Sequence, residues 1–306
     1  IPVLVFIENL FFQSSTKMEG IVNSRPPEEY RPEFLKLWSR YSLIYLGEIM
    51  FIKTISESKA NTFMQCNLKY KFRYINRYKE MSKNKDALDF GSYIHKILEK
   101  GYQKTSLEDL LTIAAGVKKN YKITEKKDSN TETCLRNFLK FNGSLTETVG
   151  VELIYDIKYD EKNDISLNGI IDRVVKSPQG EYLVIDYKTG KRELKKHELY
   201  QNHQMQGYAY AVHKLFKVPI DKITVAHFYP VTGNLVTVRF SWAQISSYLR
   251  NKVDTVWKIR KKKKEEFPPS KNEFCWWCGY SSMCPEFSNP HQIAESKRKH
   301  EDRKKK

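Results

Sequence analysis

The sequence predicts an α/β fold in which a mixed central β-sheet is flanked by helices, with a helical N-terminal part and a C-terminal segment that holds most of the cysteines. Three observations favour this fold. Apolar residues recur with the helical period of 3.6 before about residue 145. From residue 149 they recur with the strand period of two. A long helical pattern then separates these strands from two more, an order typical of a mixed sheet covered by helices.

The first 17 residues resemble an added sequence. "IENLFFQSS" (7–15) closely resembles the protease-cleavage linker ENLYFQS of expression vectors, with Phe11 in place of tyrosine. We therefore expect residues 1–17 to be the remnant of such a tag and the natural chain to begin at Met18. No apolar run reaches the 18 or more residues that span a bilayer. We expect an intracellular protein, cytoplasmic or nucleoid-associated, with no membrane partner.

Residues 18–145 form the predicted helical N-terminal region. "NTFMQCNLKYKFRYINRY" (61–78) interleaves aromatic and basic residues, which favours a helix. "DALDFGSYIHKILEKGY" (86–102) carries apolar residues on one face of a second helix. A polar, lysine-rich connection follows, and then a helix near residues 131–141.

Residues 146–265 form the predicted core. Alternating apolar residues and tight turns predict an antiparallel meander of three strands, over residues 149–160, 165–177 and 181–189. A long helix follows over residues 195–216. Two further strands are joined at "VTGN", and a last helix runs from about residue 243 to residue 263.

The composition indicates a folded protein with a polyanionic partner. Hydrophobic residues make up 40% of the chain and aromatic residues 13%, which is typical of a globular protein rather than a disordered one. The 53 lysine and arginine residues against 36 aspartate and glutamate residues give a formal charge of +17. This excess favours nucleic acid as the partner; a basic surface without a nucleic-acid role is the alternative.

Two aspartates interrupt apolar, β-branched strands. Asp172 lies in "GIIDRVV" and Asp186 in "YLVIDYK", although aspartate is a poor strand former and is rarely buried. Asp186 and Lys188 share one face of their strand, and pairing through the "PQG" turn would bring Asp172 to the same point above the sheet. Two carboxylates in one place repel each other, and a divalent cation between them removes the conflict.

Hard oxygen ligands favour Mg²⁺ or Mn²⁺ at this point. Lys188 would then activate a water molecule or stabilise charge that develops on a phosphate. A salt bridge between Asp186 and Lys188 on an exposed strand is the simpler interpretation.

The sequence resembles the PD-(D/E)xK nucleases in this spacing of an aspartate, about a dozen residues, and Asp-x-Lys on the next strand. "GIIDRV…VIDYKTGK" is similar to the RecB-type branch, which includes AddB-like and CRISPR-adaptation nucleases. Further matches to that branch are His95 in "GSYIH", Gln204 and Tyr208 in "QMQGY", and Glu152. Ile171 stands where the family usually has proline.

The resemblance implies a restriction-endonuclease-like core with a divalent-metal site. The implied metal ligands are His95, Asp172, Asp186 and the backbone carbonyl of Tyr187; the implied catalytic residues are Lys188, Asp172, Asp186 and Glu152; and the implied supporting residues are Gln204 and Tyr208. Simpler interpretations remain open. His95 could pack or hydrogen-bond on its helix, Gln204 and Tyr208 could cap an edge of the core, and Glu152 could be a solvated strand residue.

Five cysteines are present, and three of them, Cys275, Cys278 and Cys284, form Cys-x2-Cys-x5-Cys. An odd number with a clustered CxxC argues for a metal or redox site rather than a disulfide scaffold. Iron–sulfur members of the branch hold a 4Fe-4S cluster with one N-terminal and three C-terminal cysteines, which implies Cys66 as the fourth ligand. A four-cysteine zinc site is the alternative.

The cysteine segment is predicted to span residues 266–289. We expect its site to hold the fold together rather than to react, with Trp276 and Trp277 shielding it. Cys134 has no partner by spacing and is expected to be a packed free thiol. Residues 290–306 form a basic tail that we expect to be disordered.

The function that the resemblance implies is metal-dependent cleavage of DNA, most commonly by a single-stranded DNA exonuclease in repair, recombination or replication. We expect the cluster at residues 69–79 to bind single-stranded DNA, with basic side chains along the phosphate backbone and aromatic side chains stacked on the bases. The residues are Lys69, Tyr70, Phe72 and Arg73. Two alternatives stay open: a weakly active nucleic-acid-binding subunit of a helicase or integrase complex, and a zinc-stapled endonuclease for flaps or duplex ends. No GxxxxGK motif occurs, so unwinding would need a helicase or recombination partner.

Overall fold

The computed structural model describes residues 52–81, 85–190, 192–263 and 266–292, together with residues 295 and 298. All of them lie within the unit Phe51–Lys306. The expected tag, residues 1–17, and most of the expected basic tail lie outside the described residues. No helix in the part of the chain described here is long and apolar enough to cross a membrane.

The described residues contain a mixed six-stranded sheet with the order β1-β3-β4-β5-β6, and β2 pairs with β3 beside this path. The predicted α/β fold is therefore confirmed. The strands are β1 (Thr54–Ile55), β2 (Glu147–Asp160), β3 (Ile165–Lys176), β4 (Tyr182–Tyr187), β5 (Ile223–Tyr229) and β6 (Asn234–Val238).

The predicted meander of β2, β3 and β4 is confirmed, because both of its pairings are antiparallel. β5 lies parallel to β4 and is reached through the helices α10 (Lys196–Tyr200) and α11 (His203–Phe216). A turn with Gly233 at φ +80° joins β5 to the antiparallel β6, in a conformation that glycine adopts without strain.

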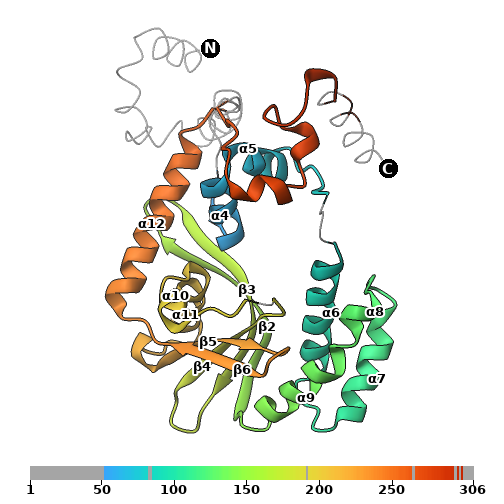
Figure 1. The fold of residues 1–306 in the computed structure, drawn as a ribbon. Coiled ribbons are helices and arrows are strands. Elements are labelled where there is room, and N and C mark those ends of the chain that lie inside the picture. The colour runs from blue at the N-terminus through green and yellow to red at the C-terminus, as the bar shows by residue number, and fades with distance from the viewer. Residues whose placement is uncertain are drawn as a thin grey trace, which may run out of the picture. The chain divides into compact units, whose positions relative to one another are not determined.

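Helices cover both faces of the sheet (Figure 1). One face packs through Val175, Ile185, Tyr187 and Phe228 against a helical layer. This layer contains α6 (Lys85–Gly101), α7 (Leu107–Lys118) and α9 (Thr131–Asn142). Because strand side chains alternate, Asp186 faces the opposite side, which is covered by α11; α12 (Trp242–Arg260) packs on α11.

The expected polar connection before residue 131 was wrong, because it contains α7 and the short α8 (Glu125–Asp128). Leu110, Ala114 and Val117 are buried at helical spacing on α7. The hydroxyl of Ser106 caps this helix by accepting a hydrogen bond from the Asp109 amide at 3.1 Å. The many lysines around the helix hide this apolar stripe in the sequence.

Two helices that the sequence predicts as continuous are interrupted. Residues 61–78 form α4 (Glu57–Gln65), α5 (Asn67–Tyr70) and the π-helical η2 (Lys71–Ile75), with Cys66 extended between the first two. Residues 195–216 divide into α10 and α11, because the side chain of Asn202 caps α11 by accepting from the Met205 amide at 3.1 Å.

The cysteine segment packs on the first of these interrupted helices, near α4 and α5 in Figure 1. It contains two 3₁₀ turns, η4 (Glu273–Trp277) and η5 (Ser281–Met283). The Leu68 amide donates to the Pro268 carbonyl at 3.2 Å, and the Tyr280 hydroxyl donates to the Tyr78 carbonyl at 2.8 Å. Segments about 200 residues apart in the sequence therefore share one small core.

Candidate metal and catalytic site

Asp172 and Asp186 lie where two paired strands part. The last pair that joins β3 to β4 is Arg173 with Ile185, so both aspartates fall just beyond it. The Tyr187 amide donates to Asp172 Oδ2 at 2.7 Å instead of to the backbone of β3. The carboxylate of Asp172 therefore accepts the hydrogen bond that the backbone of β3 would accept if the two strands stayed paired. This bond holds the carboxylate at the opening between β3 and β4.

His95 reaches this opening from α6. A Cβ atom on Gly91, one turn earlier, would lie 3.1 Å from the side chain of Thr189, so the glycine lets the helix approach the end of β4. The two ring nitrogens of His95 face two oxygen atoms, with Nε2 at 2.8 Å from the Tyr187 carbonyl and Nδ1 at 3.5 Å from Asp172 Oδ2.

These neighbours change the basicity of His95. Burial alone would lower its pKa, but the hydrogen bond and charge of Asp172, together with Asp186 and the Tyr187 carbonyl, raise the pKa of His95 above its ordinary value. Two acceptors facing the two ring nitrogens favour the imidazolium form when no cation takes the proton's place.

Glu152 comes from β2, next to the partner positions of Asp172. The pairs Val151 with Arg173 and Leu153 with Ile171 flank it. Its φ of +46° lies in the left-handed region, which costs a residue with a side chain about 1–3 kcal/mol. Burial, Asp172 and Glu99 all raise the pKa of this carboxyl group. A strained backbone that brings one carboxylate toward another indicates a site built to bind a cation.

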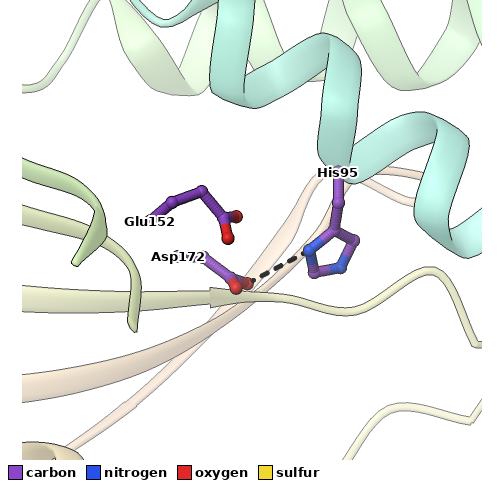
Figure 2. Close-up of side chains that lie close together, drawn as sticks. All are labelled: His95, Glu152 and Asp172. Atoms are coloured by element: carbon purple, nitrogen blue, oxygen red, sulfur yellow. Dashed lines mark ion pairs between the residues drawn. The ribbon is translucent and has the colours of Figure 1, made fainter. Parts of the chain in front are cut away.

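Figure 2 shows that the side chains of His95, Glu152 and Asp172 converge from three elements. One ligand atom from each lies within 4.8 Å of the others. Ligands on opposite sides of one Mg²⁺ ion with bonds near 2.1 Å lie about 4.2 Å apart, so small shifts would place all three on one ion. Two carboxylates and an imidazole fit Mg²⁺ or Mn²⁺ by donor type.

Asp186 stands beside this triad and is not part of it by distance. Lys188 Nζ lies 2.5 Å from Asp186 Oδ2, and the carboxylate is almost completely buried. Burial raises the pKa of Asp186 to about 6, against the lowering effect of Lys188. The predicted salt bridge between the two residues is thus present, but it is buried at a site with Asp172 and His95, not on an exposed strand.

Gln204 and Tyr208 lie one turn apart on α11, as the sequence predicts. Gln204 Nε2 donates to the Tyr208 hydroxyl at 2.8 Å and to Asp186 Oδ1 at 3.4 Å. Gln204, which also contacts Tyr208, therefore binds Oδ1 of Asp186, whereas Lys188 contacts Oδ2 of the same carboxylate. The backbone carbonyl of Tyr187, which was predicted as a metal ligand, lies 2.8 Å from His95 Nε2. It is therefore next to one member of the triad of His95, Glu152 and Asp172.

His227 is a residue of this site that sequence reasoning missed. It pairs in register with Asp186 on the parallel strand β5, and its Nε2 lies 3.5 Å from Asp186 Oδ2. Burial and the charge of Lys188 together lower the pKa of His227 to about 4, so the ring is neutral near pH 7. A histidine within the apolar run "ITVAHFY" is the signal that could have identified it.

A chain of hydrogen bonds joins the ring of His227 to the segment that follows β4. The Leu194 amide donates to the Tyr229 hydroxyl at 2.8 Å, so the hydroxyl proton is available to His227 Nδ1 at 3.3 Å. His227 Nε2 has no hydrogen-bond partner among the described residues and lies 3.5 Å from Asp186 Oδ2. The segment that follows Lys188 is in this way connected to the histidine beside Asp186.

The predicted base-stacking role of Tyr70 and Phe72 was wrong. Tyr70 is 1% exposed and stacks on Phe267, and Phe72 is 5% exposed among the aromatic residues of the small core. In a helix where aromatic and basic residues alternate, the aromatic side chains are buried and the basic ones stay exposed. The sequence alone does not show which face another segment covers. Lys69 and Arg73 both approach Glu80, at 3.3 and 3.5 Å.

The four cysteines predicted to act together line one pocket with about 420 Å³ of empty space, part of it open solvent. They are Cys66, Cys275, Cys278 and Cys284. Within the described residues, no three of their sulfur atoms lie within 4.8 Å of one another. Backbone amides donate to two of the sulfurs: those of Lys69 and Ser270 to Cys66, both at 3.5 Å, and that of Asn272 to Cys275 at 3.3 Å.

Two other expectations, one about Cys134 and one about the tryptophans of the cysteine segment, differ in outcome. Cys134 is completely buried in the helical layer, where burial raises the pKa of its thiol to about 12, as expected of a packed free thiol. Trp276 and Trp277 are 75% and 67% exposed, so the expectation that they shield the cysteine site was wrong.

Comparisons with known proteins complete the description of the site. A family model described as the PD-(D/E)XK nuclease superfamily matches residues 54–285, a range that contains His95, Asp172, Asp186 and Lys188. No curated protein matches the chain. A solved structure described as "Crystal structure of SSO0001" is 12% identical and aligns over 83% of this chain and 96% of that chain, with a TM-score of 0.40. A likeness at this level carries no argument.

Proposed function

Because the chain belongs to the PD-(D/E)XK nuclease superfamily, whose members are metal-dependent nucleases that hydrolyse phosphodiester bonds, we propose that it cuts single-stranded DNA from an end at the site formed by Asp172, Asp186, Lys188 and His95. The observation that carries the proposal is the meeting of all four side chains where β3 and β4 part.

The ligands proposed for the metal are His95, Glu152 and Asp172, with Asp186 and the Tyr187 carbonyl beside them. A divalent metal held there supplies a Lewis acid and a water of lowered pKa. The residues of the chain do the rest. His95 must give up a proton to bind, and Glu152 and Asp172 offer hard oxygen donors.

Lys188 is the proposed activator. Its side chain is about one third exposed, whereas its partner Asp186 is buried, so the ammonium group stands between the aspartate and the solvent from which a phosphate would enter. There it can orient the attacking water or stabilise the charge that grows on the phosphate. Gln204 donates to the other oxygen of Asp186, Oδ1, and His227 lies beside Oδ2, the oxygen that Lys188 contacts, so these neighbours help to keep the carboxylate aimed at the opening.

The RecB-type branch and the single-stranded substrate are finer parts of the proposal. The contact of Gln204 with Tyr208 and with Asp186 supports the branch, whose Q-x-x-x-Y motif these residues match. The formal charge of +17 supports a nucleic-acid substrate. A role in repair, recombination or replication, with a helicase or recombination partner, would follow from this activity.

A 4Fe-4S cluster is the group that we propose for the four cysteines. Tetrahedral zinc with bonds of 2.3 Å needs its sulfurs about 3.8 Å apart, closer than any three of these four lie. A cluster binds each thiolate through a different iron and so accepts wider spacing. The amides that donate to Cys66 and Cys275 would stabilise thiolates. A four-cysteine zinc site is the alternative.

The activity is tested by incubating the purified protein with end-labelled single-stranded DNA, duplex DNA and a matched RNA strand, in Mg²⁺ or Mn²⁺. We expect the single DNA strand to shorten progressively from one end. Cutting only at flaps or duplex ends would favour an endonuclease, and preference for the RNA strand would change the substrate. Absence of cleavage on all three strands with either metal would contradict the proposal.

A further inference from the structure

The cysteine segment exposes four large aromatic side chains within 14 residues. The exposed fractions are 52% for Phe274, 75% for Trp276, 67% for Trp277 and 42% for Phe287. Single exposed hydrophobic residues are common on protein surfaces, but a group of them usually marks an interaction site. Every exposed large hydrophobic side chain in residues 266–292 is aromatic, and the aliphatic Met283 is buried.

The 3₁₀ turn η4 explains how Cys275 and Cys278 are separated from the two tryptophans, whereas Phe274 lines the cysteine pocket beside them. In a 3₁₀ turn, side chains three residues apart lie on the same face. Cys275 therefore shares a face with Cys278, and both line the cysteine pocket. Phe274 shares a second face with Trp277, and Trp276 projects from the third. The geometry that directs two cysteines inward thus directs the two tryptophans toward solvent.

We propose that Phe274, Trp276 and Trp277 form a stacking surface for the bases of a single-stranded nucleic acid. The inference rests on the proposed nuclease function and adds the part of the protein that holds the unpaired strand. Phe274 and Trp277 lie on one face of the turn with Trp276 beside them, so a strand that runs along the turn can stack its bases on these exposed rings.

Charge favours a nucleic acid over a protein at this surface. Lysines precede the segment at positions 261–263. Lys69 and Lys271 line the pocket beside Phe274, with Glu286 as the acidic residue in the same lining. Cations that follow the phosphates, with aromatic rings for the bases, are the combination that binds single strands without regard to sequence.

The test compares wild-type protein with the double variant Trp276→Ala/Trp277→Ala. Binding of a short oligothymidylate and of an abasic strand of equal length is measured by fluorescence anisotropy in EDTA, where no cleavage occurs. Both strands carry the same phosphates, but only the first can stack. We expect the wild type to prefer the oligothymidylate by on the order of tenfold or more, and the double variant to bind both strands equally and weakly.

Trp242→Ala is the matched control, because Trp242 is 52% exposed at the start of α12 and should bind like the wild type. Hydrolysis of bis(p-nitrophenyl) phosphate in Mn²⁺, a substrate without bases, tests the nuclease function separately and should be equal in all three proteins. Absence of this hydrolysis in every protein would count against the nuclease function alone. A double variant that binds oligothymidylate like the wild type overturns the stacking surface, and weaker self-association in sedimentation would then identify it as a protein contact.

Discussion

His95 and Tyr187, which are 92 residues apart in the chain, meet at 2.8 Å between the imidazole Nε2 and the backbone carbonyl oxygen. The same ring approaches Asp172 through Nδ1 at 3.5 Å. Two ligands at adjacent positions on one Mg²⁺ ion lie about 2.9 Å apart when each bond is near 2.1 Å. The spacing therefore suits both a hydrogen bond and a shared cation, and a proton competes with the cation for the same nitrogen.

This competition predicts opposite pH trends for stability and metal binding. The pKa of His95 is raised in the folded protein, so its charged form stabilises the fold below the unfolded pKa of about 6.5. That stabilisation is lost as the pH rises through the folded pKa. We expect the advantage of the wild type over His95→Gln in thermal unfolding with EDTA to shrink above pH 6.5.

Affinity for Mn²⁺, measured by calorimetry, should rise more steeply with pH in the wild type than in His95→Gln, because only in the wild type does the ion also displace a proton from the ring. Equal affinity in the wild type and His95→Gln at every pH would mean that the histidine is merely packed against the sheet.

Substitution of Glu152 by glycine should relieve backbone strain and at the same time weaken metal binding. Replacement by glycine removes the carboxylate and also the strain at φ +46°, whereas replacement by alanine removes only the carboxylate. We expect Glu152→Gly to be more stable than Glu152→Ala by roughly 1 kcal/mol, and both to bind Mn²⁺ more weakly than the wild type. Denaturant unfolding and calorimetry measure the two effects. Wild-type metal affinity in both variants would exclude the glutamate as a ligand.

His227 is expected to act through Asp186 as a positioning residue. His227→Leu removes the ring nitrogen that lies 3.5 Å from the carboxylate, which leaves the ionised form of Asp186 less stabilised. We expect the acid limb of the pH–rate profile to move to higher pH, with KM nearly unchanged and kcat reduced. His227→Asn, which keeps an N–H donor, should recover part of the rate. An unshifted profile in His227→Leu would leave only a packing role.

The cysteine site predicts a coloured protein whose stability depends on four thiols. Protein purified without oxygen should absorb broadly near 400 nm and contain roughly four irons per chain. Cys278→Ser should lose the colour and melt at a lower temperature, because the site joins segments about 200 residues apart and closing such a loop contributes on the order of 4–5 kcal/mol by analogy with a disulfide. Cys134→Ser should keep the colour.

A colourless protein with one zinc per chain would replace the cluster by zinc and keep the structural role. Full thermal stability in Cys278→Ser would remove that role as well.

Sequence patterns predicted five of the six strands because these strands are apolar, β-branched runs and the turns between them carry glycine, proline or asparagine; the two-residue β1 is too short to leave a pattern. The pattern failed where tertiary contacts decide. Asn202 and Cys66 divide helices that periodicity joins, and lysines conceal the stripe of α7. Tyr70 and Trp276 show the same limit, since base stacking was predicted for Tyr70 and a shielding role for Trp276, yet Tyr70 is buried against Phe267 and Trp276 is exposed. His227 was missed because its partner comes from the adjacent parallel strand.

The most direct test of the site is single-turnover cleavage of end-labelled single-stranded DNA by Asp186→Ala and Lys188→Ala, with Mn²⁺ binding measured on the same preparations. Both variants should keep the fold and lose cleavage by several orders of magnitude. Lys188→Ala should still bind Mn²⁺, and Asp186→Ala should bind it more weakly, because one residue activates and the other is a proposed ligand. Wild-type cleavage rates in both variants would contradict the assignment of the active site.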